Sequence, residues 1–163
     1  MEHILRRKEE REKFLERRKH LPTGTFTVVI DFSYTTIQTD QEMKSLRNQV
    51  NHSYGFNAHA PIPVPLHLTS FTGRIKDYVT QLTGFSSWNI ATHEEHFLEC
   101  FPREKIVYLT SDSPELLETL DPEAIYIIGG MVDHNRLKVY TYTYVISFLS
   151  RRELPMQMLK RTV

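Results

Sequence analysis

Short apolar runs alternate with amphipathic segments along most of this 163-residue chain, and this alternation constrains the fold more than any other feature. The apolar runs are short enough to be central strands, and helical spacing or helix-start signals fall between them. Strands that alternate with helices in this way predict an α/β protein with a parallel sheet and flanking helices. The expected strands are 26–30, 66–69, 105–109 and 125–128, with a further short strand at 88–92.

The segment 40–54 carries apolar residues at helical spacing, which predicts a helix with one face packed on the sheet. Thr39 or Asp40 can cap its first turn, because a side-chain oxygen there accepts a hydrogen bond from an unpaired backbone N–H. The expected buried face consists of Met43, Leu46, Val50 and Tyr54.

Three further helical segments are expected. One lies at 71–82, and one or two helical turns lie at 93–101. The run Thr110-Ser-Asp-Ser-Pro114 is a helix-start signal, because Pro114 would stand near the first helical position. The buried face of that third helix would consist of Leu116, Leu117 and Leu120.

Composition is ordinary for a soluble globular protein, with 40% hydrophobic and 25% charged residues and a formal net charge of zero. Global charge therefore does not indicate a nucleic-acid-binding protein, although a local basic patch remains compatible with it. The single cysteine excludes an intramolecular disulfide and fits a reducing compartment. No apolar run is long enough to span a membrane, and the amino-terminal residues are too charged for a secretory signal. We expect a nuclear or cytoplasmic protein with no membrane partner.

Residues 1–20 are almost wholly charged and predict a helical arm with little apolar face. Such an arm suits contact with RNA phosphates, and it equally suits a solvated surface helix. The run Leu21-Pro-Thr-Gly breaks the pattern, so the globular domain is expected to begin near residue 25.

Two loops follow neighbouring predicted strands and carry the candidate chemistry. The first begins at Leu109 and Thr110. The second begins at Gly129 and Gly130 and reaches Asp133 three positions later. Glycines allow unusual backbone angles and close approach of a ligand, and α/β sheets bind ligands at the carboxyl ends of their strands.

Several other chemistries are poorly supported. The sequence has no phosphate-binding Gly-x-x-x-x-Gly-Lys loop, no dinucleotide-binding Gly-x-Gly-x-x-Gly and no Gly-x-Ser-x-Gly nucleophile elbow. His93, His96 and Cys100 could share one helix face, but the spacing is not His-Glu-x-x-His and no second ligand pair stands out. We therefore expect a surface helix there and no metal.

Taken together, the segments around the two loops closely resemble one family. These segments are Ile106-Val-Tyr-Leu-Thr-Ser-Asp-Ser-Pro114, Leu120-Asp-Pro and Tyr126-Ile-Ile-Gly-Gly-Met-Val-Asp-His-Asn-Arg-Leu-Lys138, together with Asp31-Phe-Ser-Tyr, Leu66-His-Leu-Thr-Ser and Gly73-Arg-Ile-Lys76. They are similar to the SPOUT-fold tRNA methyltransferases that modify N1 of the purine at position 9. The resemblance is collinear over residues 6–138.

The resemblance implies S-adenosylmethionine as the methyl donor, tRNA as the substrate and a SPOUT methyltransferase domain. Leu109, Thr110, Gly129 and Gly130 would shape the donor pocket. Asp133 would be the general base that relieves guanine N1 of its proton, since a protonated N1 is a poor nucleophile. Whether guanine or adenine is preferred stays open.

The resemblance also suggests how tRNA is held. Arg74, Lys76 and Arg136 are candidate phosphate contacts, and the alternative for each is a solvated surface charge. Members of the family often act as monomers, so a monomer is expected here.

After Lys138 the sequence departs from the family pattern. Residues 139–150 alternate Tyr and Thr like a strand, and 151–163 read as a short basic tail. We expect a partial domain at 25–138 that lacks the carboxyl-terminal knot portion, followed by an atypical tail at 139–163 that could derive from aberrant splicing. In that case methyl transfer would be impaired, and the alternative function is a non-catalytic RNA-binding isoform without a donor pocket.

Overall fold

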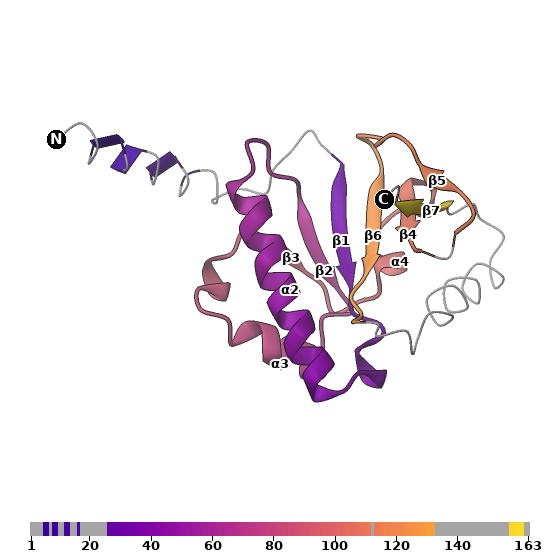
Figure 1. Cartoon of the computed structure of the whole chain (residues 1–163), viewed down its shortest axis with the longest axis horizontal. Helices are drawn as coiled ribbons and strands as arrows, with labels where there is room; N and C mark the ends of the chain where they lie inside the picture. The colour runs from indigo at the N-terminus through magenta and orange to yellow at the C-terminus, as the bar shows by residue number, and fades with distance from the viewer. Residues whose placement is uncertain are drawn as a thin grey trace.

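An all-parallel sheet organises the chain (Figure 1). The computed structural model describes residues 26–111, 113–132 and 157–161, together with positions 5, 6, 8, 9, 12, 13 and 16. Within these residues the strand order is β3-β2-β1-β6-β4-β7-β5, and each pairing is parallel. The strands are β1 (Thr27–Asp31), β2 (Leu66–Thr69), β3 (Ala91–Thr92), β4 (Ile106–Leu109), β5 (Leu116–Leu117), β6 (Ile125–Gly129) and β7 (Gln157–Arg161).

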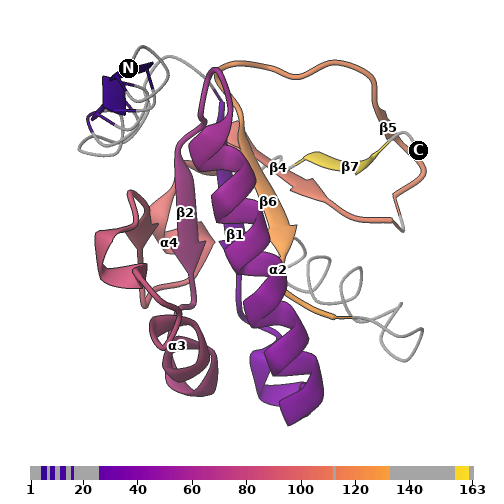
Figure 2. The same ribbon diagram turned by 60° about the vertical axis from the view of Figure 1, so that its left-hand side comes forward.

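Helices cover the two faces of the sheet, as Figures 1 and 2 show. On one face lie α2 (Asp40–His59) and α3 (Gly73–Thr80), and on the other lies the short α4 (Phe97–Cys100). The expected parallel α/β architecture and its five sequence-predicted strands are therefore confirmed. Three 3₁₀ turns complete the described elements: η1 (Thr35–Ile37), η2 (Phe85–Ser87) and η3 (Arg103–Lys105).

The long helix α2 forms where its sequence pattern predicts. Thr39 is the N-cap: its hydroxyl accepts from the backbone N–H of Glu42, and the Glu42 carboxylate accepts from the backbone N–H of Thr39. This reciprocal capping box satisfies two amides that the helix itself cannot pair. The predicted apolar face is buried on the sheet, through Met43, Leu46, Val50 and Tyr54.

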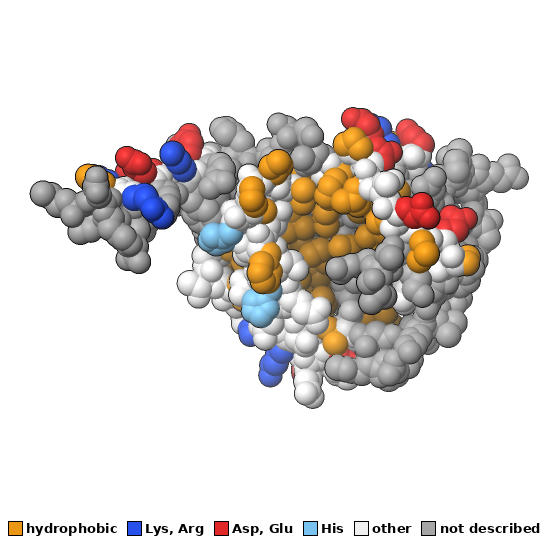
Figure 3. All heavy atoms as spheres, turned by 45° about the horizontal axis from the view of Figure 1, so that its top comes forward, with side chains coloured by type: hydrophobic (Ala, Val, Ile, Leu, Met, Phe, Trp, Pro, Cys, Tyr) orange, Lys and Arg blue, Asp and Glu red, His pale blue; other side chains and the backbone are white. Residues whose placement is uncertain are grey.

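Alternation along β1 divides the core into two layers. Ile30 packs with the α2 and α3 side chains, whereas Val29 packs with Phe97 of α4 on the opposite face. In register, Ile30 pairs with Ile128 of β6, which is 43% exposed. Figure 3 shows a hollow lined by hydrophobic side chains on the face that it presents. On the face that α2 covers, the helices therefore bury β1 more completely than β6.

The helix predicted to follow Pro114 does not form. Leu116 and Leu117 instead make β5, which pairs with Lys160 and Arg161 of β7. The predicted apolar face is not buried, since Leu116 is 52% exposed. A segment this short, stopped by a proline at 122, cannot offset helix nucleation without packing, so pairing with another strand prevails.

The helical turns predicted at 93–101 begin later than expected. His93 continues the extended path of β3, and its backbone N–H donates to the carbonyl of Leu68 at 2.8 Å. His96 has extended backbone angles and caps α4 by accepting from the backbone N–H of Leu98. The helix therefore starts at Phe97, and the predicted helix face that would join His93, His96 and Cys100 is wrong.

The two ends of the chain are described in part. All seven described positions between 5 and 16 are helical and exposed, as predicted for the charged arm. The strand-like pattern at 139–150 lies outside the described residues, whereas 157–161 form β7 rather than only a basic tail. Within the described part of the chain, no helix combines the length and apolarity that crossing a membrane requires.

Replacing Thr39 by alanine tests the capping box. The variant should lower the free energy of unfolding by about 1 kcal/mol, because the backbone N–H of Glu42 loses its acceptor. Thr72→Ala is the matched control, since Thr72 is the N-cap of α3 without a side-chain cap hydrogen bond. Urea denaturation of both variants gives the comparison, and equal destabilisation would contradict the assigned role of Thr39.

Candidate functional site

The two predicted loops meet at the carboxyl edge of the sheet. β4 pairs with β6 through Leu109 and Ile128, and β6 pairs with β1 through Gly129 and Asp31. The chain following β4, the chain following β6 and the end of β1 therefore leave the sheet side by side. Leu109 is partly buried and Thr110 is 7% exposed. The expectation that the loops follow neighbouring strands is confirmed.

The glycine pair is required by close packing. A Cβ atom on Gly130 would lie 2.7 Å from Phe32 Cδ1 and 2.9 Å from the carbonyl oxygen of Asp31. A Cβ atom on Gly129 would lie 2.9 Å from the hydroxyl oxygen of Tyr108. The expected unusual backbone angles are absent at both glycines, because positive φ among the described glycines occurs only at 73 and 84. The pair lets β6 approach its neighbours closely.

Two tyrosine hydroxyls lie beneath this edge. The hydroxyl oxygens of Tyr34 and Tyr108 are 3.0 Å apart and buried. Tyr34 follows β1 and Tyr108 belongs to β4, so the hydrogen bond spans β6, which lies between these strands. The hydrogen-bonded tyrosines lie directly against Gly129 and support the carboxyl end of β6.

Asp31 is a fully buried carboxylate at the end of β1. Its Oδ1 accepts from the hydroxyls of Ser33 at 2.9 Å, Ser70 at 2.9 Å and Thr69 at 3.2 Å. Its Oδ2 has no hydrogen-bond partner among the described residues. Burial raises the pKa of Asp31, and the nearby His96 and the three hydroxyls oppose that rise. A buried carboxyl group is thus held at the centre of the strand ends.

Ser70 reaches Asp31 through a strained backbone. Its φ of 51° lies in the left-handed region that costs a non-glycine residue about 1–2 kcal/mol. The conformation is held by the Ser70 backbone N–H, which donates to the carbonyl of Glu95 at 2.8 Å. The segment after β3 therefore fixes a hydroxyl donor at the carboxyl edge.

Gln38 ties the glycine loop to the helical layer. Its side-chain amide donates to the carbonyl of Gly130 at 3.2 Å, and its Oε1 accepts from the backbone N–H of Val132 at 3.5 Å. The side chain is 3% exposed, so these bonds are shielded from water. Val132 directly precedes Asp133, which lies outside the described residues. Gln38 therefore fixes the chain from which Asp133 emerges.

Two of the predicted basic residues, Arg74 and Lys76, lie on the surface of α3. Arg74 pairs with Asp40 and also donates to the backbone carbonyl of Gln38 at 3.2 Å. Lys76 pairs with Glu94 at 2.7 Å. The side chains of Arg74 and Lys76 are 49% and 45% exposed, so both remain accessible to a ligand. Arg136 lies outside the described residues.

The sequence pattern predicts no role for Asp31 or Gln38. Asp31 directly follows the predicted strand 26–30, at a carboxyl end where α/β sheets bind ligands, and this position could have identified it. Gln38 offers no such signal, because its partners Gly130 and Val132 are more than ninety positions away. A polar residue before a capped helix is typical of a solvated loop.

The parallel sheet, with helices on both faces and a glycine loop beside a buried carboxyl group, fits an α/β domain of the SPOUT type. Residues 1–158 match the family described as "tRNA (guanine(9)-N(1))-methyltransferase TRM10/TRM10A", so the chain belongs to this family. The match extends past Lys138, where the sequence resemblance was expected to stop.

Individual relatives agree with this assignment. The human protein named "tRNA methyltransferase 10 homolog A" is 34% identical over 142 residues, which cover 85% of this chain and 42% of that protein. The Schizosaccharomyces pombe "tRNA (guanine(9)-N1)-methyltransferase" is 35% identical over 151 residues, covering 81% and 49% respectively. This chain thus spans less than half the length of these curated relatives.

Solved structures support the fold. The crystal structure described as the complex of full-length spTrm10 with SAH superposes with a TM-score of 0.77 at 30% sequence identity. The superposition covers 87% of this chain and 76% of that one. The dual-specific Trm10 from Thermococcus kodakaraensis gives a TM-score of 0.61 at 19% identity, which supports the fold alone. The predicted SPOUT-type parallel sheet is confirmed.

Replacing Asp31 by asparagine tests the raised pKa. Burial favours the protonated carboxyl in the folded state, so its stabilising contribution is complete below the ordinary value of 3.8. The contribution is lost as pH rises through the raised folded pKa. The free energy of unfolding of the wild type should therefore decline relative to that of Asp31→Asn over this window.

Denaturation series between pH 3 and pH 8 measure this difference. Asp77→Asn, which removes an exposed carboxylate from α3, serves as the control. A difference between wild type and Asp31→Asn that stays constant with pH would show that the folded pKa is not raised.

Proposed function

We propose that this chain transfers a methyl group from S-adenosylmethionine to N1 of guanine at position 9 of tRNA. The observation that carries the proposal is the meeting of the Leu109–Thr110 and Gly129–Gly130 segments at one edge of the sheet, inside the family match. The chain spans less than half the length of its curated relatives, so we propose their activity for this chain.

The edge suits a sulfonium donor. The spTrm10 structure contains SAH, which is what S-adenosylmethionine becomes after losing its methyl group. In this chain the Asp31 carboxyl group is buried beside Gly129, and its Oδ2 has no hydrogen-bond partner among the described residues. When ionised, this carboxylate would favour a cation bound nearby. Leu109 and Thr110 would flank the donor on the β4 side, and the glycine backbone would lie on the β6 side. The donor supplies an electrophilic methyl group when bound.

The proton on guanine N1 is the chemical obstacle. A carboxylate at Asp133 within hydrogen-bond reach would accept this proton as N1 attacks. Gln38 would hold the preceding loop, since it binds both Gly130 and Val132. Orientation of the base against the donor would supply much of the remaining acceleration.

Basic residues on the same side would hold the tRNA. Arg74 and Lys76 lie on α3 and remain about half exposed, which suits contact with phosphates. Arg136 and the charged arm at 1–20 would extend this surface. Exposed ion pairs contribute only about 0–1 kcal/mol, so phosphate oxygens can replace Asp40 and Glu94 at little cost.

The proposal includes a monomeric protein located in the nucleus or cytoplasm. Monomeric action follows from the resemblance to the family. The location follows from the tRNA substrate and from the single cysteine, which fits a reducing compartment.

A methyl-transfer assay with Asp133→Asn tests the general base. The purified full chain, S-adenosylmethionine and a tRNA transcript with guanine at position 9 should yield N1-methylguanine. Asp133→Asn should lower kcat about 100-fold or more, because general-base catalysis contributes at least that factor. Donor affinity, measured by calorimetry, should stay within a few-fold of the wild type.

Asp121→Asn is the control, since Asp121 is an exposed loop residue whose Oδ1 accepts from the backbone N–H of Glu123. A transcript with adenine at position 9 defines the base preference. If the folded wild-type chain binds tRNA but neither donor binding nor methyl transfer is detected, the proposal fails and a non-catalytic RNA-binding role replaces it.

Gln38→Ala tests the loop support. Losing two buried hydrogen bonds should destabilise the protein by about 1–3 kcal/mol and weaken donor binding by about tenfold. Gln49→Ala is the matched control, since Gln49 is an exposed residue of α2. If a folded Gln38→Ala protein binds the donor as tightly as the wild type, Gln38 does not support the donor site.

A further inference from the structure

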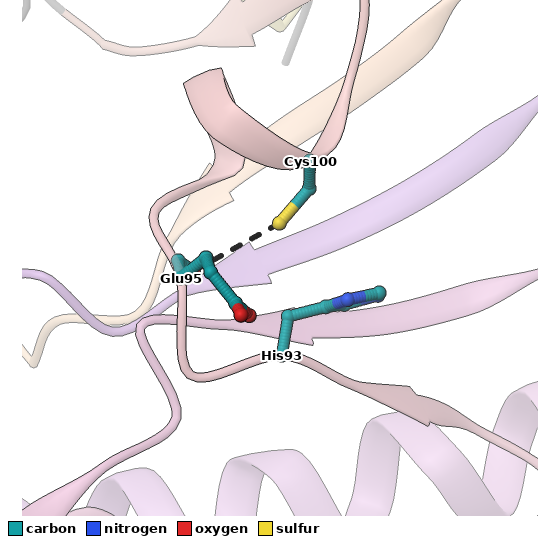
Figure 4. A group of neighbouring side chains, drawn as sticks. All are labelled: His93, Glu95 and Cys100. Carbon is teal, nitrogen blue, oxygen red and sulfur yellow. Dashed lines mark hydrogen bonds between the residues drawn. The ribbon is translucent and has the colours of Figure 1, made fainter.

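A second cluster of reactive side chains lies beside the end of β2, where the segment after β3 leads into α4. His93 and Glu95 come from the segment after β3, and Cys100 comes from α4 (Figure 4). One potential ligand atom from each residue lies within 4.8 Å of the other two. Imidazole nitrogen, carboxylate oxygen and thiolate sulfur are the three donor types that zinc accepts in proteins.

The imidazole is already oriented by a second histidine. His67 on β2 places its Nδ1 3.0 Å from His93 Nε2, with the two rings within 4° of parallel. Phe101 packs edge-on against both rings. The hydrogen bond between the two rings engages Nε2 of His93 and leaves its Nδ1 for a ligand, which is the support that metal-binding histidines usually have.

The backbone of the cluster is held as well. The carbonyl of His93 accepts from the backbone N–H of Phe71, and the carbonyl of Glu95 accepts from that of Ser70. Cys100 turns its sulfur toward Glu95, whose carbonyl oxygen is 4.0 Å away. Two segments from different elements therefore present their donors to one space.

The local charge favours a cation. Two exposed carboxylates, those of Glu95 and Glu99, carry negative charge close to the sulfur of Cys100. A divalent cation would be attracted by these carboxylates and would stabilise the Cys100 thiolate. The sulfur would form a bond to the metal, and the thiol proton would pass to solvent.

We propose that His93, Glu95 and Cys100 bind a zinc-like divalent cation, with water completing a tetrahedral site. The set differs from the one considered from the sequence, because His96 caps α4 and Glu95 takes its place. A bound ion would fasten α4 to the segment that holds Ser70. Binding of the ion does not require the proposed methyl transfer.

Metal titration of the full chain tests the proposal. The protein, stripped with a chelator and reduced, is titrated with Zn²⁺ against a chromophoric competitor and separately with Co²⁺. We expect one ion per chain, a thiolate-to-cobalt absorption band, and protection of Cys100 from alkylation by iodoacetamide that the chelator reverses. Melting temperature should rise with added Zn²⁺, because the ion binds only the folded chain.

Variants identify the ligands. Cys100→Ser should abolish the cobalt–thiolate band, and His93→Gln should weaken zinc binding at least ~10-fold. Glu95→Gln should also weaken it and alters only an exposed side chain, so folding is not at risk. Glu99→Gln and His52→Gln are controls that remove an exposed neighbouring carboxylate and an exposed distant imidazole. Absence of the cobalt–thiolate band, or Glu95→Gln binding zinc as tightly as the wild type, would overturn the proposal.

Discussion

The close approach of β6 to β1 at their carboxyl ends is the constraint on which the candidate site depends. Gly130 donates its N–H to the carbonyl of Asp31 at 2.7 Å, and any Cβ atom there would collide with Phe32. This contact brings the loop after β6 against the end of β1, where the buried carboxyl group lies. A larger residue at position 130 would have to displace backbone, which a packed sheet resists. Gly130 is therefore needed for the packing of β6 against β1, whether or not a ligand is bound.

A buried carboxyl group can persist at this edge because its surroundings are built from three strand ends. Hydroxyls of Ser33 after β1, of Thr69 at the end of β2 and of Ser70 after it donate to one oxygen of Asp31, which offsets part of the cost of removing the carboxyl group from water. One of these donors, Ser70, is held in a strained conformation by the carbonyl of Glu95. The segment after β3 therefore supports both the carboxyl edge and the proposed metal site. Strain of this kind is typically retained where neighbouring structure over-determines it.

The sequence predicted the fold wherever local pattern and tertiary packing agree. The apolar residues of α2 recur at helical spacing, and the N-cap Thr39 directly precedes the helix. Both features are local in the sequence, so both could be predicted correctly. The segment at Leu116 and Leu117 could not, because its partner strand β7 lies 44 positions further along the chain (Leu116 pairs with Lys160), and this pairing outweighs a local helix-start signal. The two loops of the site could be predicted because α/β sheets bind ligands at the carboxyl ends of their strands. The role of Gln38 depends on contacts across the fold, which no local pattern encodes.

Arg74 connects the basic surface to the glycine loop through a single residue. Its guanidinium donates to the backbone carbonyl of Gln38, while the Gln38 side chain binds Gly130 and Val132. The ion pair of Arg74 with Asp40 is exposed, so a phosphate can compete for the guanidinium without a large loss of stability. Any shift of Arg74 toward such a phosphate would act on the backbone of Gln38. The surface proposed to hold tRNA and the loop that leads to Asp133 are therefore joined by direct hydrogen bonds, and binding at one has a physical route to the other.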